Sequence, residues 1–130
     1  TKGDRQRVAV ASVLAAQPQV LVFDEPTTGL DGEETDRMMR MLMHLNRAGH
    51  TVIIITHHLG LVAGSVRRSL VLRDGRILAD GPTREVFRTL LAAKGYETLG
   101  LEVPPLTRFA ARWGDTLLTV NEVRAAMRRI

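Results

Sequence analysis

An apolar run that ends in two adjacent carboxylates constrains this chain more than any other feature. Residues Val20 to Phe23 are all apolar, and Asp24 and Glu25 follow them directly. A continuous run of this kind is typical of a strand buried in a parallel sheet, and open α/β sheets bind their ligands at the carboxyl ends of such strands. We therefore expect a strand that presents both carboxylates at a ligand-binding edge, where one can serve Mg²⁺ and the other a water molecule.

Helix and strand signals alternate around this run and predict an α/β fold with a mainly parallel sheet and flanking helices. Apolar spacing predicts a helix from about Gly3 to Ala16, and Thr1 followed by Asp4 has the spacing of a helix cap. A second helix is expected over residues 33–48, with Asp31 as its amino-terminal cap.

A second β-branched run, Thr51 to Thr56, predicts another central strand, which ends at His57. Shorter signals then predict a helix, a hairpin with an Asp74-Gly75 turn, and a further helix, at residues 59–63, 69–79 and from 82 onward. The expected topology is a right-handed strand–helix–strand crossover closed by an antiparallel edge hairpin.

Composition narrows the classes of function. The 130 residues suffice for one modest core, 45% of them are apolar, and no apolar run is long enough to span a membrane or to resemble a secretion signal. The net charge is +4 with scattered arginines, and aromatic residues make up 4%, so no nucleic-acid partner is expected. The absence of cysteine excludes a disulfide framework and a thiolate metal site.

Four motifs occur in the order that is typical of one family. They are Thr1 to Ala9, Leu21 to Pro26, Gly29 to Asp31, and Thr56-His57. In this order they resemble the signature loop and helix, Walker B strand, D-loop and switch histidine of the ATP-binding subunits of ABC transporters. The resemblance implies the carboxyl-terminal part of a P-loop NTPase domain over residues 1–94.

The resemblance also implies a role for each matching residue. Asp24 is expected to hold Mg²⁺, and Glu25 to polarise the water that attacks ATP, because phosphoryl transfer requires neutralised oxygens and an oriented nucleophile. His57 is expected to contact the γ-phosphate or to orient the water, with His58 as its rival for that role. Asp31 is expected to communicate across a dimer of ATP-binding subunits, which is compatible with its capping a helix.

The signature loop departs from the family pattern. Where the family has Ser-Gly-Gly-Gln, this chain has Thr1-Lys2-Gly3-Asp4. Thr1 retains a hydroxyl and Gly3 retains one position for close approach to phosphate, whereas Asp4 places a negative charge there. Two interpretations remain open: a well-capped helix in a weakened ATP site, or a functional loop in which Lys2 supplies a cation to the phosphate.

No Gly-x-x-x-x-Gly-Lys-Ser/Thr loop occurs in the 130 residues, and the chain opens within a motif. We therefore expect a fragment of a longer ATPase that is inactive in isolation. Two alternatives remain: a soluble ABC ATPase of DNA repair or translation, and a nonhydrolytic interaction module derived from an ATPase.

The tail refines the resemblance. Residues 95–130 carry Gly100 to Ala110 and Leu118 to Val123, which look like the helical extension of energy-coupling factor ATPases, including the cobalt and nickel uptake type. This implies dimerisation through the tail, at the cytoplasmic face of the cell membrane. The implied partners are a second ATPase, a transmembrane coupling protein and a substrate-binding membrane protein.

Overall fold

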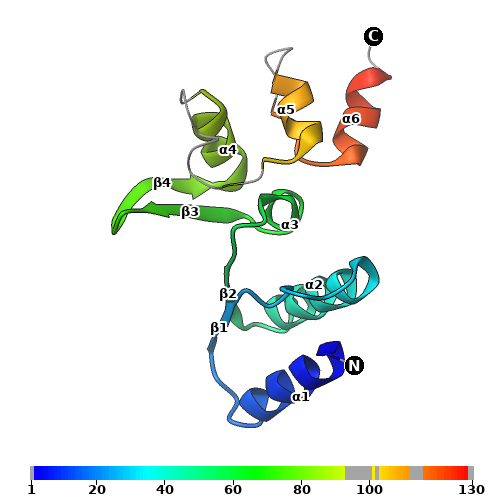
Figure 1. Ribbon diagram of the computed structural model, residues 1–130, viewed down its shortest axis with the longest axis vertical. Coiled ribbons are helices and arrows are strands. Elements are labelled where there is room, and N and C mark those ends of the chain that lie inside the picture. Colours follow the sequence, from blue (N-terminus) through cyan, green and yellow to red (C-terminus); the bar gives the residue numbers. More distant parts are fainter. Residues whose placement is uncertain (1, 93–100, 102, 112–115, 129–130) are drawn as a thin grey trace. The chain divides into compact units, whose positions relative to one another are not determined.

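The computed structural model describes residues 2–92, 101, 103–111 and 116–128. It divides the chain into two compact units, Thr1–Thr56 and His57–Ile130. Within the described residues, no helix is both long enough and apolar enough to cross a membrane. Figure 1 follows the elements along the chain by colour.

The first unit is built on two parallel strands and a crossover helix. Strand β1 (Val20–Asp24) pairs with β2 (Thr51–Ile55), with Val20 opposite Thr51 and Asp24 opposite Ile55. Helix α2 (Gly32–Arg47) connects the two strands and packs against β2. The predicted strand, helix and parallel strand are therefore confirmed, with β1 one residue longer than expected.

Helix α2 has the predicted boundaries to within one residue. The Asp31 carboxylate accepts a hydrogen bond of 2.8 Å from the Glu34 backbone N–H, so Asp31 is the amino-terminal cap. At the other end, Gly49 takes a φ of +104°, which an L side chain rarely adopts, and the helix stops. One face of α2 is buried and carries Met38, Met39, Leu42 and Leu45.

The apolar run predicted a strand buried in a parallel sheet, and the described residues bury only part of that strand. Side chains alternate between the faces of a sheet, and only one face of the β1–β2 pair is covered. Leu21 is 3% exposed, whereas its neighbours Val20 and Val22 are 52% and 60% exposed, and Ile53 and Ile55 of β2 are also exposed. The continuous apolar run thus identified the strand correctly.

Helix α1 (Lys2–Leu14) is slightly shorter than the predicted helix. Its expected apolar face is largely open, since Val10 is buried but Val8 and Val13 are 67% and 54% exposed. Asp4 lies in the first turn, where the helix dipole stabilises a negatively charged carboxylate. Thr1, and with it the predicted cap, lies outside the described residues.

The second unit opens with a short helix and a hairpin. Helix α3 (Leu59–Ala63) precedes β3 (Arg68–Arg73) and β4 (Arg76–Pro82), which pair antiparallel. Asp74 and Gly75 have φ values of +49° and +73°, as the predicted two-residue turn requires. In the described residues this hairpin is a sheet of its own, so its expected place as the edge of the parallel sheet is not observed.

Helix α4 (Thr83–Ala92) packs against both strands of the hairpin. A single apolar cluster lies between them and α3, and Phe87 at its centre is only 1% exposed. The other buried members are Leu59, Ala63, Val71, Val86, Leu90 and Val103. The exposed ends of β3 and β4 are linked by Arg68 and Asp80, whose hydrogen bond lowers the pKa of the Asp80 carboxyl.

The helical extension expected in the tail is present in the described residues as α5 (Pro105–Ala111) and α6 (Val120–Met127). Thr119 and Glu122 form a reciprocal capping box at the start of α6. The Glu122 carboxylate also accepts a hydrogen bond of 2.5 Å from Arg84 of α4, and Arg84 donates to the Thr116 carbonyl. The predicted boundary near residue 95 lies outside the described residues.

Glu122 should make the docking of α6 dependent on pH. Burial raises the pKa of this carboxyl, but hydrogen bonds from the Leu118 N–H and from Arg84 outweigh burial and lower it overall. A folded-state pKa below the unfolded value contributes stability above the unfolded pKa, and that stability disappears as the pH falls through the folded pKa.

We expect Glu122→Gln to weaken α6 by about 1 kcal/mol at pH 7, because the charged hydrogen bonds are lost. Hydrogen exchange of the α6 amides in the full-length protein should then accelerate about fivefold. The difference from wild type should vanish at a pH below the folded pKa of Glu122. Glu85→Gln, at an exposed position on α4, is the matched control, and equal acceleration in both variants would contradict the assignment.

Candidate active site

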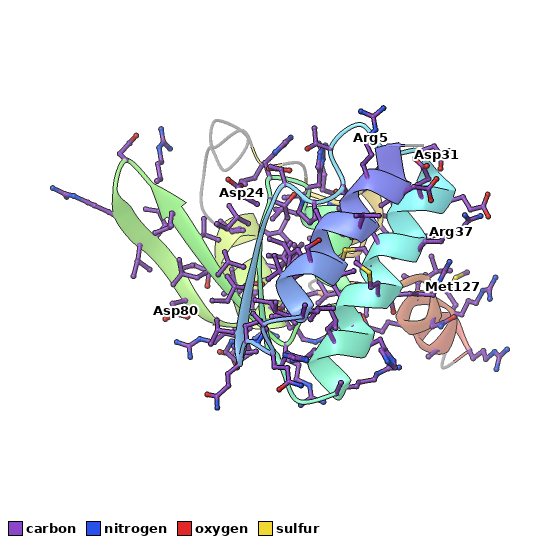
Figure 2. The ribbon with its side chains drawn as sticks, turned by 90° about the horizontal axis from the view of Figure 1, so that it is seen from below. Arg5, Asp24, Asp31, Arg37, Asp80 and Met127 are labelled. Carbon is purple, nitrogen blue, oxygen red and sulfur yellow. The ribbon has the colours of Figure 1, made fainter. Side chains whose placement is uncertain are left out.

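The two carboxylates that follow the apolar run occupy the end of β1. Asp24 is the last residue of the strand and its side chain is exposed (Figure 2). Glu25 comes next, and its backbone N–H donates a hydrogen bond of 2.9 Å to the Ile55 carbonyl, so the parallel pairing continues one residue beyond β1. Both carboxylates therefore lie at the carboxyl end of the parallel sheet, as the sequence predicted.

The backbone of Glu25 is unusual. Its φ is +45°, in the left-handed region, which costs a residue with a Cβ about 1–2 kcal/mol. Residues held in such conformations concentrate at functional sites, where the surrounding hydrogen bonds maintain them. Here the chain turns immediately, and the Thr28 N–H donates to the Glu25 carbonyl over 3.2 Å.

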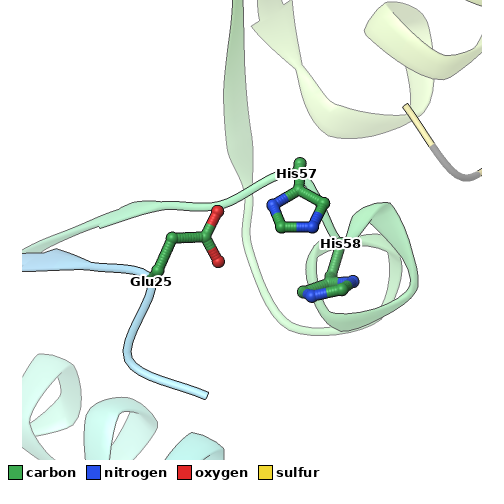
Figure 3. A group of neighbouring side chains, drawn as sticks. All are labelled: Glu25, His57 and His58. Atoms are coloured by element: carbon green, nitrogen blue, oxygen red, sulfur yellow. The ribbon is translucent and has the colours of Figure 1, made fainter. Parts of the chain in front are cut away.

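Two threonine hydroxyls bind the carboxylate of Glu25. Thr28 Oγ1 donates to Glu25 Oε2 over 3.3 Å, and Thr56 Oγ1 donates to the same oxygen over 3.2 Å. Figure 3 shows the Glu25 side chain beyond the end of its strand. Sequence reasoning missed both threonines, although their positions, three residues after Glu25 and directly after β2, are the signal that could have found them.

Asp31 occupies the end of the loop that begins at Glu25. Gly29, with a φ of +72°, allows the chain to turn there, and Asp31 then caps α2. Figure 2 labels Asp31 at the amino-terminal end of this helix. The capping half of the prediction for Asp31 is confirmed, and a role across a dimer stays a prediction.

The histidines open the second unit. His57 is exposed and follows Thr56 directly in the chain, while His58 is half-buried at the amino-terminal end of α3. Their ring centroids lie 4.0 Å apart with the planes tilted by 38° (Figure 3). The side chain of His58 makes no capping hydrogen bond to α3. The choice between the two imidazoles for a phosphate contact stays open.

The residues of the predicted signature loop lie on a different element from Asp24 and Glu25. Lys2, Gly3 and Asp4 form the first turn of α1, and Asp4 is exposed. A helix amino terminus offers backbone N–H groups to an anion. Thr1 is outside the described residues, so the roles of all four residues toward phosphate remain predictions.

Comparison with curated proteins relates the whole chain to ATP-binding proteins, although no family model matches it. Over 129 residues and 99% of its length, it is 43% identical to a relative from Caldanaerobacter subterraneus subsp. tengcongensis that is named an ABC transporter ATP-binding protein. It is also 41% identical over 108 residues, or 83% of its length, to the energy-coupling factor transporter ATP-binding protein EcfA2 of Streptococcus sanguinis. The chain spans only 22% and 38% of these relatives, respectively.

Solved structures give the same relationship. The chain resembles cbiO1 of Clostridium perfringens, described as part of the ABC transporter complex cbiONQ, with a TM-score of 0.63 and 35% identity over 70% of this chain and 38% of that one. It also resembles an ATP-binding cassette in a dimeric, post-hydrolysis state with ADP and phosphate. That likeness has a TM-score of 0.57 and 33% identity, over 65% of this chain and 36% of the other.

Proposed function

Because this chain belongs to the ATP-binding proteins of ABC transporters, we propose that it is part of a longer ATPase that energises membrane import of a vitamin or a transition-metal ion. The observation that carries the proposal is Glu25, a carboxylate fixed by two hydroxyls at the carboxyl end of a parallel strand. The names EcfA2 and cbiO1 among the similar proteins support the energy-coupling branch.

Glu25 acts as the base that orients and polarises the water attacking the γ-phosphate of ATP. A general base must lie within hydrogen-bond reach of its proton and be held there, which the geometry around Glu25 favours. His57, at the exit of β2, contacts the γ-phosphate or the water, with His58 as the alternative.

Asp24 would hold Mg²⁺ through water. The fit rests on donor chemistry, since an exposed carboxylate at the end of β1 supplies the hard oxygen that Mg²⁺ prefers, and such sites use one or two carboxylates alongside substrate phosphates. When bound, Mg²⁺ neutralises charge on the phosphate oxygens. In this proposal Asp24 binds the metal and Glu25 polarises the attacking water.

Each ATP is bound between this protein and a second ATPase subunit. The predicted signature loop, Thr1 to Asp4, contacts the γ-phosphate held by that partner, and Asp31 transmits the state of one site to the other. The tail of residues 95–130 contributes to dimerisation. Three large apolar side chains exposed on its helices support this role, namely Phe109, Val120 and Met127.

The remaining partners are a transmembrane coupling protein and a substrate-binding membrane protein. The ATPase therefore works at the cytoplasmic face of the cell membrane as a peripheral subunit. The name of cbiO1, part of the complex cbiONQ, supports an assembly of this kind.

The proposal is tested by measuring phosphate release from Mg-ATP by the full-length protein and by residues 1–130 alone. We expect turnover from the full-length protein and none from the 130 residues, because they contain no glycine-rich loop of the Gly-x-x-x-x-Gly-Lys-Ser/Thr type. Turnover by the 130 residues would overturn the account. ATP binding without turnover by the full-length protein would favour a nonhydrolytic module.

A further inference from the structure

The hydroxyls of Thr28 and Thr56 reach one oxygen of Glu25 from two different elements. Thr28 lies in the loop after β1 and donates over 3.3 Å, and Thr56 follows β2 and donates over 3.2 Å. All three residues belong to the first unit of the chain. The carboxylate is therefore tied to its own loop and to the neighbouring strand at the same time.

The backbone around Glu25 is fixed in the same way as its side chain. The Glu25 N–H is bonded to the Ile55 carbonyl, and the Glu25 carbonyl accepts from the Thr28 N–H. Thr56 follows Ile55, the residue opposite Asp24 in the strand register. The backbone hydrogen bonds of Glu25 therefore hold Thr28 itself and Ile55, the residue before Thr56. The same bonds place both threonine hydroxyls near the carboxylate.

This arrangement matters because a glutamate side chain is otherwise free to adopt several rotamers. Two donors on one carboxylate oxygen restrict the orientation of the group. A base that is misplaced by about 1 Å can lose about a hundredfold in rate. A strained backbone at Glu25, held by its neighbours, fits a group whose orientation is functionally important.

We propose that Thr28 and Thr56 are positioning residues for Glu25 in ATP hydrolysis. The inference rests on the proposed function, in which Glu25 is the base. The threonines touch neither ATP nor water in this proposal; they act only by orienting the carboxylate. Their removal should therefore slow the chemical step and leave the binding of ATP unchanged.

The test uses Thr28→Val and Thr56→Val in the full-length protein, because valine keeps the β-branched shape and removes the hydroxyl. We expect each change to lower kcat about tenfold, the effect of losing one hydrogen bond to a charged group, with KM for ATP within about twofold of wild type. Thr28→Ser and Thr56→Ser keep the hydroxyl and should restore kcat.

Thr51→Val is the matched control. Thr51 is the first residue of β2, at the opposite end of the strand from Thr56, and it is exposed. The same substitution there should leave kcat unchanged. If one valine variant does not fold, the valine and serine variants at the other threonine still test the positioning role.

Glu25→Gln separates this inference from the function on which it rests. In a Glu25→Gln background the valine changes should have no further effect on kcat, because the carboxylate that acts as the base is gone. Full turnover by Glu25→Gln would overturn the proposed function. The positioning role alone would be overturned if Glu25→Gln loses turnover but both valine variants keep the wild-type kcat. It would also be overturned if the valine variants lose activity and the serine variants do not restore kcat.

Discussion

Glu25→Gln in the full-length protein should abolish most ATP turnover while ATP still binds. The amide keeps the size of the side chain and still accepts hydrogen bonds from Thr28 and Thr56, so the loop after β1 should fold as before. What is lost is the negative charge that polarises the attacking water. Removing a general base typically lowers kcat by about 10²–10⁴-fold.

The measurement is kcat from steady-state phosphate release together with the dissociation constant for Mg-ATP. We expect the dissociation constant to change by less than about threefold, since a group that acts only in the transition state contributes little to binding of the substrate. Glu34→Gln is the matched control, because Glu34 lies in the first turn of α2 and takes part in its cap only through its backbone N–H. A large loss in both variants would contradict the specific role of Glu25.

Phe87→Ala should be the most destabilising change in the second unit. Phe87 is 1% exposed at the centre of the cluster between α4, α3 and the hairpin. Replacing a buried phenylalanine by alanine removes its burial energy and leaves a cavity, at a cost of about 3–5 kcal/mol. We expect the midpoint of thermal unfolding of this unit to fall by at least about 12 °C.

Arg88→Ala is the matched control, because it truncates a large side chain at an exposed position next to Phe87 on the same helix, α4. Substitutions at such positions change the free energy of unfolding by about 0.5 kcal/mol or less. Scanning fluorimetry of both variants in the full-length protein gives the comparison. Similar midpoints for the two variants would show that the cluster around Phe87 is not the core of this unit.

The elements that sequence predicted well are those whose signals are local. Asp31 caps α2 through an atom three residues away, and Asp74-Gly75 makes a two-residue turn, so neither depends on distant parts of the chain. The parallel pairing of β1 and β2 was also predicted, because a helix between two apolar runs gives few alternatives.

The features that sequence did not predict depend on contacts between distant residues. The Thr56 hydroxyl lies 31 residues from Glu25 along the chain, and the Arg84–Glu122 pair is separated by 38 residues. Neither spacing follows a helix or strand period, so periodicity does not identify the partners. The left-handed φ of Glu25 could not be predicted from the sequence either, because glutamate has no preference for that conformation.

The exposure of one face of the β1–β2 pair was also not predicted from the sequence. Alternation within a strand shows which side chains share a face, but it does not show what covers that face. Val22 and Ile53 are apolar and exposed side by side in the register. The burial of that face depends on what packs against it, and this chain spans only 22% and 38% of the two relatives compared.

The central claim is that Glu25 activates the water that cleaves ATP, and a single-turnover measurement tests it most directly. Full-length wild type and Glu25→Gln are each loaded with Mg-ATP below the enzyme concentration, and the conversion of bound ATP to ADP and phosphate is followed in time. We expect both proteins to bind ATP and the variant to convert it at least about a hundredfold more slowly than the wild type. Equal rates of conversion would contradict the central claim.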